Sequence, residues 1–257
     1  MANNGGKFAW YELMSTDTAA AARFYEGVLG WSSADSGMPG ANYTLFSAGP
    51  TMIAGLMQIP EEMKTHGTQP NWTGYIGVDN VDAYVGRVGA GGGRLQRPPE
   101  DIPGVGRFAV VADPQGAVFV LFQPSSDEAP PKLDPMTPGN VGWHELMTAD
   151  RDKAFEFYSN LFGWSKVAAH DMGPMGIYQT FSDSAGQEVG GMMTKPPDFP
   201  MSCWAYYFSV ASVDAAVARI KSGKGEIMMG PMEVPGGSWV ANCVDPQGAH
   251  FAIVGPK

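Results

Sequence analysis

Hydrophobic and polar positions near the start of the chain first alternate and then follow a helical spacing. Within residues 7–14 every second residue shares a face, as in a strand, which puts Trp10 and Glu12 on the same side. Apolar residues then recur three and four positions apart until Gly30. Asp17 directly precedes this run, where an N-cap belongs. The pattern predicts a strand followed by a helix that Gly30 ends.

Short apolar runs separated by glycine and proline fill the next stretch. Residues 36–70 suit strands joined by turns. We expect the polar residues 61–71 to form a surface loop that carries His66.

A further strand and helix begin at Trp72. The helix is expected to be capped by Asp79 or Asn80 and stopped by the glycine-rich residues 89–93. Two strands then follow, joined by an Asp-Pro-Gln-Gly turn at 113–116. The first half of the chain therefore contains two successive units of the order βαβββ.

The second half of the chain repeats the first. Residues 8–33 align with residues 141–166 at a constant offset of 133 (141 minus 8). The turn segment 112–124 recurs at 244–256 with an offset of 132 (244 minus 112). The repeat predicts two tandem copies of one domain.

The predicted domains are residues 1–124 and 141–257, and the polar, proline-rich residues 125–140 link them. A four-stranded sheet with one helix on its back leaves one face bare, so two such units must pair. Pairing curves their mixed sheets around a concave cleft, where a ligand would bind. We therefore predict an α+β fold with two βαβββ units in each domain.

Composition narrows the range of partners. The formal net charge is −10, and no cluster of Lys and Arg offers a patch for nucleic acid or an anionic membrane. No segment has the apolar run of a signal peptide or membrane span. We expect a cytoplasmic protein with a small-molecule ligand, either a monomer with intrachain domain pairing or a homodimer. Cys203 and Cys243 lack metal-site spacing and are interpreted as two buried thiols rather than a disulfide or metal pair.

A combination of motifs occurs in both halves. Each first strand carries Trp-x-Glu, each following helix carries Phe-Tyr and ends in Gly-Trp, and each half has an Asp-Pro-Gln-Gly-Ala turn. Together they resemble the vicinal oxygen chelate superfamily, which includes glyoxalase I, bleomycin-resistance proteins and extradiol dioxygenases. The chain looks like the tandem two-domain bacterial branch of this superfamily.

The resemblance implies a divalent metal held by His and Glu side chains on the strands. Counting from the capping and turn aspartates, the family's ligand positions fall on Trp10 and Trp143, Val120 and Ala252, Thr73 and Ala205, and near 55–57 and 191–193. None of these residues is a carboxylate or an imidazole, and a metal ion needs three or four suitable donors. We therefore expect no metal and no other cofactor.

A displaced metal site is the alternative. Glu145 shares the face of Trp143, and His250 shares the face of Ala252, so this pair could hold a divalent ion weakly. Val118 replaces His250 in the first half, so the arrangement is not repeated. His144 has the opposite parity to Trp143 and is expected to be structural. His170 is expected to lie in an exposed turn at residues 168–173.

Glu12 and Glu145 are the candidate catalytic residues. Desolvation on an apolar face would make each carboxylate a plausible general base or ligand acceptor. The alternative is a carboxylate satisfied by a nearby tyrosine hydroxyl or backbone amide, which holds the sheet together.

Aromatic and thioether side chains are expected to line the clefts. A flat indole and adaptable methionines suit a small apolar or aromatic molecule, unless they fill the cleft completely. The predicted ligand-binding residues are Trp10, Met14, Met57, Thr73, Val120, Trp143, Met147, Met193, His250 and Ala252, with Met192 beside them.

Three functions follow from these expectations. The first is a binding protein or enzyme that works on a small molecule without the family metal. The second is a metal-dependent glyoxalase-like lyase or a dioxygenase or hydroxylase. The third is a non-enzymatic, resistance-type protein that sequesters its ligand.

Overall fold

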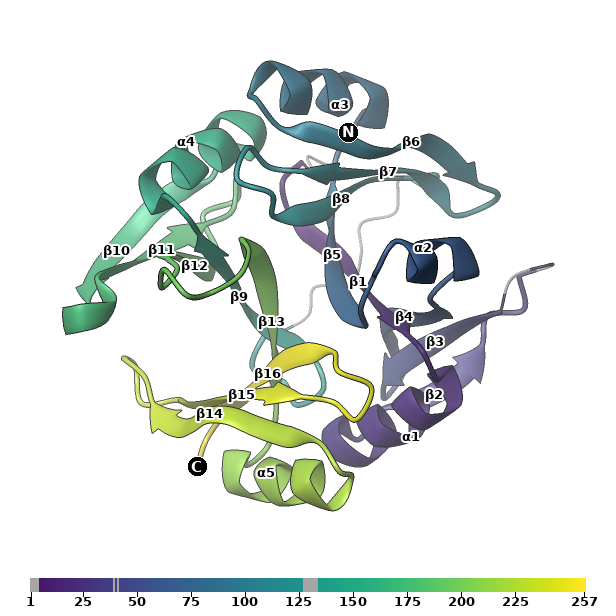
Figure 1. Ribbon diagram of the computed structural model, residues 1–257, viewed down its shortest axis with the longest axis vertical. Helices are drawn as coiled ribbons and strands as arrows, with labels where there is room; N and C mark the ends of the chain where they lie inside the picture. Colours follow the sequence, from purple (N-terminus) through teal and green to yellow (C-terminus); the bar gives the residue numbers. More distant parts are fainter. Residues whose placement is uncertain (1–4, 39, 41, 127–133) are drawn as a thin grey trace. The chain divides into compact units, whose positions relative to one another are not determined.

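The computed structural model describes residues 5–38, 40, 42–126 and 134–257 (Figure 1). Residues 127–133 of the expected linker 125–140 lie outside the described residues. The first half contains β1 (Phe8–Ser15), α1 (Thr18–Leu29), β2 (Ser32–Asp35), β3 (Tyr43–Ala48), β4 (Thr51–Gln58), α2 (Glu61–Thr65), β5 (Asn71–Gly77), α3 (Val81–Ala90), β6 (Arg94–Ile102), β7 (Gly106–Ala112) and β8 (Val118–Pro124). The second half contains β9 (Val141–Thr148), α4 (Arg151–Phe162), β10 (Ser165–Asp171), the 3₁₀ helix η1 (Gly173–Met175), β11 (Ile177–Ser182), β12 (Glu188–Thr194), β13 (Cys203–Ser209), α5 (Val213–Ser222), β14 (Glu226–Glu233), β15 (Trp239–Val244) and β16 (His250–Gly255).

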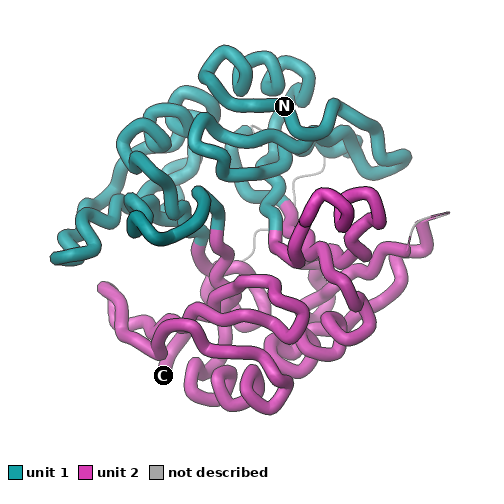
Figure 2. Tube along the Cα trace, in the orientation of Figure 1, with its two compact units in different colours: residues 1–9, 73–131, 144–204 teal, residues 10–72, 132–143, 205–257 magenta. Residues whose placement is uncertain are grey.

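The chain forms two compact units, and each takes one βαβββ segment from each half of the sequence (Figure 2). Unit 1 comprises residues 1–9, 73–131 and 144–204. Unit 2 comprises residues 10–72, 132–143 and 205–257. The compact units therefore cut across the sequence repeat.

Each βαβββ segment is a mixed four-stranded ladder. The strand orders are β5-β8-β7-β6 and β10-β11-β12-β9 in unit 1, and β2-β3-β4-β1 and β13-β16-β15-β14 in unit 2. The first and last strands of each segment pair in parallel, and the remaining pairs are antiparallel. The α+β fold class with repeated βαβββ segments is thus confirmed.

Local sequence signals set the limits of the helices, as predicted. The Asp17 carboxylate accepts a hydrogen bond from the Ala20 amide at 2.9 Å and caps α1. Gly30 ends α1 with φ of 72°, a left-handed conformation that costs glycine little. Asp150 and Gly163 play the same two roles for α4. Among the described residues no helix is long and apolar enough to span a bilayer.

Two local expectations were wrong, and one strand was left without residues. The order βαβββ requires a strand between α3 and β7, but no residues were assigned to it, because β6 is polar and includes Pro98 and Pro99. A strand tolerates these prolines at the edge of a ladder. The expected loop 61–71 contains the one-turn helix α2, although His66 is exposed at its end. His170 lies half-buried in β10 instead of in an exposed turn.

A buried Trp-Tyr-Asp chain joins the two segments inside each unit. In unit 2 the Trp72 indole donates to the Tyr25 hydroxyl at 2.9 Å, and Tyr25 donates to the Asp245 carboxylate at 3.0 Å. The second oxygen of Asp245 accepts the amides of Gln247 and Ala249 in its own turn. A turn from the second half is thereby tied to a helix from the first.

Unit 1 contains an equivalent Trp-Tyr-Asp chain, in which the second half supplies the tryptophan and tyrosine and the first half supplies the aspartate. Trp204 donates to Tyr158 at 3.0 Å, and Tyr158 donates to Asp113 at 3.2 Å. Burial raises the pKa of Asp113 and of Asp245, although the donated hydrogen bonds oppose this shift. The aspartate of the Asp-Pro-Gln-Gly turn therefore connects segments that are far apart in sequence.

The backbone amides of the two capping aspartates, Asp150 and Asp17, donate hydrogen bonds to different acceptors. In unit 1 the Asp150 amide donates to the Gln115 side chain, whose nitrogen donates back to the Asp150 carbonyl at 2.8 Å. In unit 2 the Asp17 amide donates instead to the Ser15 hydroxyl at 3.3 Å.

In each unit, the side chain equivalent to the acceptor of the other unit is left without this hydrogen bond. Two buried side-chain atoms in the described part of the chain have no hydrogen-bond partner, the Thr148 hydroxyl in unit 1 and the Gln247 amide oxygen in unit 2. Thr148 is the repeat counterpart of Ser15, and Gln247 is the counterpart of Gln115.

Candidate functional site

The side chains of β1 separate onto two faces in unit 2. Tyr11 and Leu13 are buried, whereas Trp10, Glu12 and Met14 are half-buried. This split follows the predicted alternation. We call the half-buried surface formed by Trp10, Glu12, Met14, Tyr43 and Met57 the Trp10 face.

A hydrogen-bonded chain crosses the Trp10 face. The Trp10 indole donates to the Tyr43 hydroxyl at 3.0 Å, and Tyr43 donates to the Glu12 carboxylate at 3.1 Å. Burial, followed by the negative charge of Glu12, holds the pKa of Tyr43 well above its usual range. Tyr43 is therefore a neutral donor at any physiological pH, and its proton points to Glu12.

A glycine makes room for this tyrosine. Tyr43 stands on β3, and Glu12 lies opposite Gly55 in the parallel pairing of β1 with β4. A Cβ at Gly55 would overlap the Tyr43 ring and hydroxyl, so the ring can cross β4 only where the side chain is missing. Met57 lies opposite Met14 on the same strands.

Unit 1 contains a matching surface on β9 and β12. Glu145 lies opposite Gly191, and Met147 lies opposite Met193. Tyr178 crosses Gly191 as Tyr43 crosses Gly55, because a Cβ there would overlap its ring. We call the surface of Glu145, Met147, Tyr178 and Met193 the Glu145 face.

Sequence reasoning did not identify Tyr43, Tyr178 or their glycines. The repeat carried the signal: Tyr43 and Gly55 both recur, at offsets of 135 and 136 (178 minus 43, 191 minus 55). A tyrosine paired with a glycine in both copies indicates a ring that needs an empty position on the neighbouring strand.

Cys203 lies near Glu145 in unit 1. Burial and then the Glu145 charge raise the pKa of this thiol to about 11, so it is protonated at neutral pH. Cys243 in unit 2 is buried, and burial raises its pKa to about 12. Both cysteines are free thiols, as predicted, although Cys203 is only half-buried.

Three of the family's ligand positions fall within one apolar cluster of unit 2. Trp143 and Ala205 pack against buried residues that include Ala252. The cluster consists of Tyr207, Val240, Ala252 and Val254, with Trp143, Ala205, Met232 and Val234 against them. Its side chains include no carboxylate, imidazole or thiolate for a divalent ion.

The other family positions have no better donors. Trp10 offers an indole N–H, which donates to Tyr43. Thr73 is half-buried on β5, and Val120 is buried on β8. No group of three or more His, Cys, Asp and Glu side chains that could hold a metal occurs in the part of the chain described. The residues at the family's ligand positions do not fit a divalent metal ion.

The histidines separate into buried and exposed. His144 is buried in unit 1, where it stacks on Phe8 with ring centroids 3.8 Å apart and hydrogen-bonds the Val189 carbonyl at 2.7 Å through Nδ1. Burial lowers the pKa of His144 to about 4, so its ring is neutral, which fits the expected structural role. His250 is exposed on β16, and its pairing with Glu145 stays a prediction.

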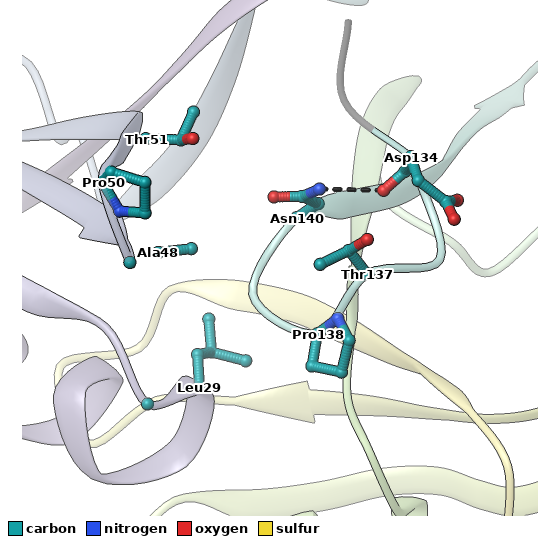
Figure 3. A pocket seen from close by; sticks show the side chains of 10 residues that line it. Leu29, Ala48, Pro50, Thr51, Asp134, Thr137, Pro138 and Asn140 are labelled. Atoms are coloured by element: carbon teal, nitrogen blue, oxygen red, sulfur yellow. Dashed lines mark hydrogen bonds between the residues drawn. The ribbon is translucent and has the colours of Figure 1, made fainter.

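Two surface cavities lie apart from the predicted site residues. One of about 480 Å³ in unit 2 lies beside the end of α1, where Asn140 donates to the Asp134 carbonyl at 2.8 Å (Figure 3). The other, about 640 Å³ in unit 1, lies between α3 and α4. Neither is lined by a sequence-predicted site residue, so neither marks the chemistry of Glu12 or Glu145.

Curated relatives match nearly the full length of the chain. "Putative glyoxylase CFP32" of Mycobacterium tuberculosis is 31% identical over 251 residues, covering 96% of this chain and 94% of that protein. "Anthracycline biosynthesis protein DnrV" of Streptomyces peucetius is 34% identical over 268 residues, covering 97% and 93%.

Solved structures share the fold at low identity. The Mn(II)-bound glyoxalase of Novosphingobium aromaticivorans superposes with a TM-score of 0.66 at 18% identity, over 98% of this chain and 82% of that one. The 2,2',3-trihydroxybiphenyl 1,2-dioxygenase of Sphingomonas wittichii strain RW1 gives 0.69 at 13% identity, over 98% and 90%.

The family's own sequence pattern matches both halves. The match covers residues 7–121 and again residues 140–253, which is most of the chain and repeats as the internal duplication does. The chain therefore belongs to the Glyoxalase/Bleomycin resistance protein/Dioxygenase superfamily.

Proposed function

We propose that this protein binds a small apolar or aromatic molecule on the Trp10 face and on the Glu145 face, without the family's metal. The observation that supports the proposal most is the chain from Trp10 through Tyr43 to Glu12. The Trp10 face combines an aromatic ring, a pair of thioethers and a carboxylate on one half-buried surface. Ligand sites commonly combine an apolar lining with a few fixed polar groups.

The proposal excludes the metal because of the donor chemistry. Indole, methyl and isopropyl groups and the hydroxyl of Thr73 occupy the counted ligand positions, and Trp143, Ala205 and Ala252 belong to one apolar cluster. On the Trp10 face, the Tyr43 ring crosses the position of Gly55, near which another family ligand falls. Any displaced ion near Glu145 and His250 would need most of its ligands from water.

The Tyr43 hydrogen bond bears on the role of Glu12. The Tyr43 hydroxyl that donates to Glu12 is the contact that the structural alternative expected, a carboxylate satisfied by a nearby tyrosine. In the enzymatic version, Glu12 or Glu145 would still take a proton from a carbonyl or hydroxy compound.

The names of the relatives point to different chemistry. One is named for a glyoxylase and another for anthracycline biosynthesis. Two alternatives to the proposal follow from the family: a metal-dependent lyase or dioxygenase with the ion displaced to Glu145 and His250, and a sequestering protein that needs no reactive group.

Metal analysis of the purified native protein tests the first alternative. We expect far less than one Zn, Ni, Fe or Mn per chain by plasma mass spectrometry. A stoichiometric ion that survives dialysis would overturn the metal-free proposal. Lyase activity on the hemithioacetal of methylglyoxal and a thiol, assayed with and without added metal, is the matching activity screen.

Substitution of both carboxylates separates catalysis from sequestration. Glu12→Gln with Glu145→Gln keeps the side-chain shape and removes both charges. Activity that survives the double change rules out the general-base version. Retained binding by a protein without activity supports sequestration.

A glycine pair tests whether Tyr43 organises the site. Gly55→Ala should displace the Tyr43 ring and weaken ligand binding by about tenfold, the effect of losing one hydrogen bond to a charged group. Gly27→Ala is the matched control, because no atom lies within 4 Å of a Cβ at this position on α1. Equal binding by both variants would rule out a role for Tyr43.

A further inference from the structure

We infer that the cavity beside the carboxyl end of α1 in unit 2 is a second binding site, which takes a compact apolar molecule with an uncharged hydroxyl group. The site goes beyond the proposed function, because the residues of the Trp10 face and the Glu145 face do not line this cavity. Its volume is about 480 Å³, and its walls are residues 29–30, residues 48–51 and four residues between 134 and 140. We call it the Asn140 pocket.

The side chain of Asn140 is fixed with its oxygen toward the pocket. Asn140 is 5% exposed, and its side-chain nitrogen donates to the Asp134 carbonyl at 2.8 Å. Turning the amide over would set its oxygen against that carbonyl, so the contact fixes the orientation. Figure 3 shows the oxygen directed to the wall that contains Pro50 and Thr51. None of the hydrogen bonds among the described residues uses this oxygen, so it is an acceptor for a molecule in the pocket.

The backbone around Asn140 is held in place as well. The Gly139 amide donates to the Ser209 carbonyl, and the Ser209 amide donates to the Asn140 carbonyl, each at 2.8 Å. The Trp31 indole donates to the Gly139 carbonyl at 2.7 Å. These contacts join three segments of unit 2 and fix this wall of the pocket before a ligand arrives, which lowers the cost of binding.

The remaining walls select an apolar and uncharged molecule. Leu29, Pro50 and Pro138 provide apolar surface. Asp134 is the one charged residue among the described residues that line the pocket, and Figure 3 shows its carboxylate turned away from the cavity. A charged ligand would lose hydration without gaining a counter-charge. A ligand hydroxyl avoids this cost and donates to the Asn140 oxygen, which a ligand without a donor would leave unpaired.

The sequence repeat indicates one such pocket per chain. The tryptophan that follows the first helix of each half donates to the carbonyl of Gly6 in unit 1 and of Gly139 in unit 2, so these glycines correspond. The next residue is Lys7, which is exposed, in unit 1 and Asn140, which is buried, in unit 2. The buried amide acceptor is therefore specific to unit 2.

Phenol, anisole and benzoate test the inference on the full-length protein. Their rings are alike, but phenol carries a hydroxyl donor, the oxygen of anisole cannot donate, and benzoate is charged. Titrations followed by two-dimensional proton–nitrogen NMR give dissociation constants and show where each probe binds. The amide signals of Gly30 and Gly49 report the Asn140 pocket, and the indole signal of Trp10 reports the Trp10 face.

We expect phenol to shift the signals of Gly30 and Gly49. It should bind there about fivefold more tightly than anisole, the effect of one hydrogen bond between uncharged groups. Benzoate should bind more weakly than anisole, because its charge loses hydration in the pocket.

Two variants remove different features of the pocket. Asn140→Ala removes the acceptor, so phenol and anisole should bind to this variant with equal affinity. Thr51→Phe puts a ring into the pocket from the facing wall and should weaken the binding of both probes by roughly tenfold. Met52→Phe is the matched control, because Met52 is the next residue of β4, is exposed and does not line the pocket.

Equal affinity for phenol and anisole in the wild type would overturn the inference. Signals that shift only at Trp10 would also overturn it and would leave the proposed function standing. A preference for phenol that persists in Asn140→Ala would assign the contact to another group and contradict the inference. If Asn140→Ala does not fold, equal binding of phenol by Thr51→Phe and Met52→Phe decides against the pocket.

Discussion

Ser15 and Thr148 end equivalent strands, yet only the Ser15 hydroxyl has a hydrogen-bond partner among the described residues. Ser15 accepts the Asp17 amide, whereas the Thr148 hydroxyl is buried and has no partner among the described residues. Thr148→Val removes the unused hydroxyl at nearly constant volume. The free energy of unfolding should stay the same or rise by up to about 1 kcal/mol, as measured by urea denaturation.

Ser15→Ala is the matched comparison. It removes the acceptor of the Asp17 amide, and the free energy of unfolding should fall by about 1 kcal/mol. Equal losses in the two variants would show that the two strand ends are alike.

Because His144 is buried, we expect the free energy of unfolding to depend on pH. Its pKa in the folded protein is about 4, below the ordinary value of 6.5, because the ring is buried. The unfolded chain therefore takes up a proton between these values, and the folded chain does not. The contribution of neutral His144 to the free energy of unfolding is fully present above pH 6.5. As the pH falls toward 4, on the order of 3 kcal/mol of this free energy is lost.

Denaturation curves between pH 7.5 and 4 measure this effect. In His144→Phe, which keeps a ring against Phe8, the decline over this range should become shallower. His66 and His250 are exposed and remain in both proteins. An identical decline in the variant would mean that other groups cause it.

At the scale of elements, the Trp-Tyr-Asp chains tie a turn to a distant helix. In Tyr158→Phe one oxygen of the Asp113 carboxylate loses the Tyr158 donor, and the Trp204 indole loses its acceptor, both in a buried place. We expect the free energy of unfolding to fall by about 1 to 3 kcal/mol. The repeat counterpart Tyr25→Phe should cost a similar amount in unit 2.

Tyr84→Phe provides the control for the lost hydroxyl. Tyr84 is half-buried on α3, and its ring contacts with Phe162 and Arg87 do not need the hydroxyl. Its free energy of unfolding should change by less than about 0.5 kcal/mol. A comparable loss at Tyr84 and Tyr158 would rule out a special role for the buried chain.

The helices were predictable because their limits depend on neighbours in sequence. Asp17 caps α1 from one residue away, and Gly30 ends it with its own backbone conformation. β6 was not predictable in this way, since its polar residues form a strand only through pairing with β7. Cap signals are local, whereas an edge strand depends on the neighbour that it pairs with.

For the whole molecule, the arrangement of the units predicts how separated halves behave. Each compact unit requires segments from both halves. In each Trp-Tyr-Asp chain, one half supplies the tyrosine and the other half supplies the aspartate. Residues 1–126 and 134–257, produced as separate chains, should therefore fold cooperatively only when the two are mixed or when two copies of one half pair. Size-exclusion chromatography and denaturation of the separate and mixed halves measure this.

A half that is monomeric and unfolds cooperatively alone would contradict the prediction. A half that folds only as a pair of identical copies would agree with it, because the second copy supplies the missing segment. The intact chain is the control for both measurements.

The sequence by itself determined the duplication, the order βαβββ, the caps of α1 and α4, and the poor fit of the family's metal. Each of these follows from residues that are close in sequence or from the identity of a residue at a counted position. It also placed Trp10 and Glu12 on one face, because alternation along a strand needs no knowledge of other strands.

Only the tertiary structure decided which segments share a core and what Glu12 contacts. Tyr43 reaches Glu12 across Gly55 from another strand, and Asp245 meets Tyr25 from 220 residues away. Such contacts depend on strand pairing and on the exchange of segments between halves, and neither leaves a periodic trace in the chain. The physical reason is that side-chain periodicity reports which face is buried, but not which partner buries it.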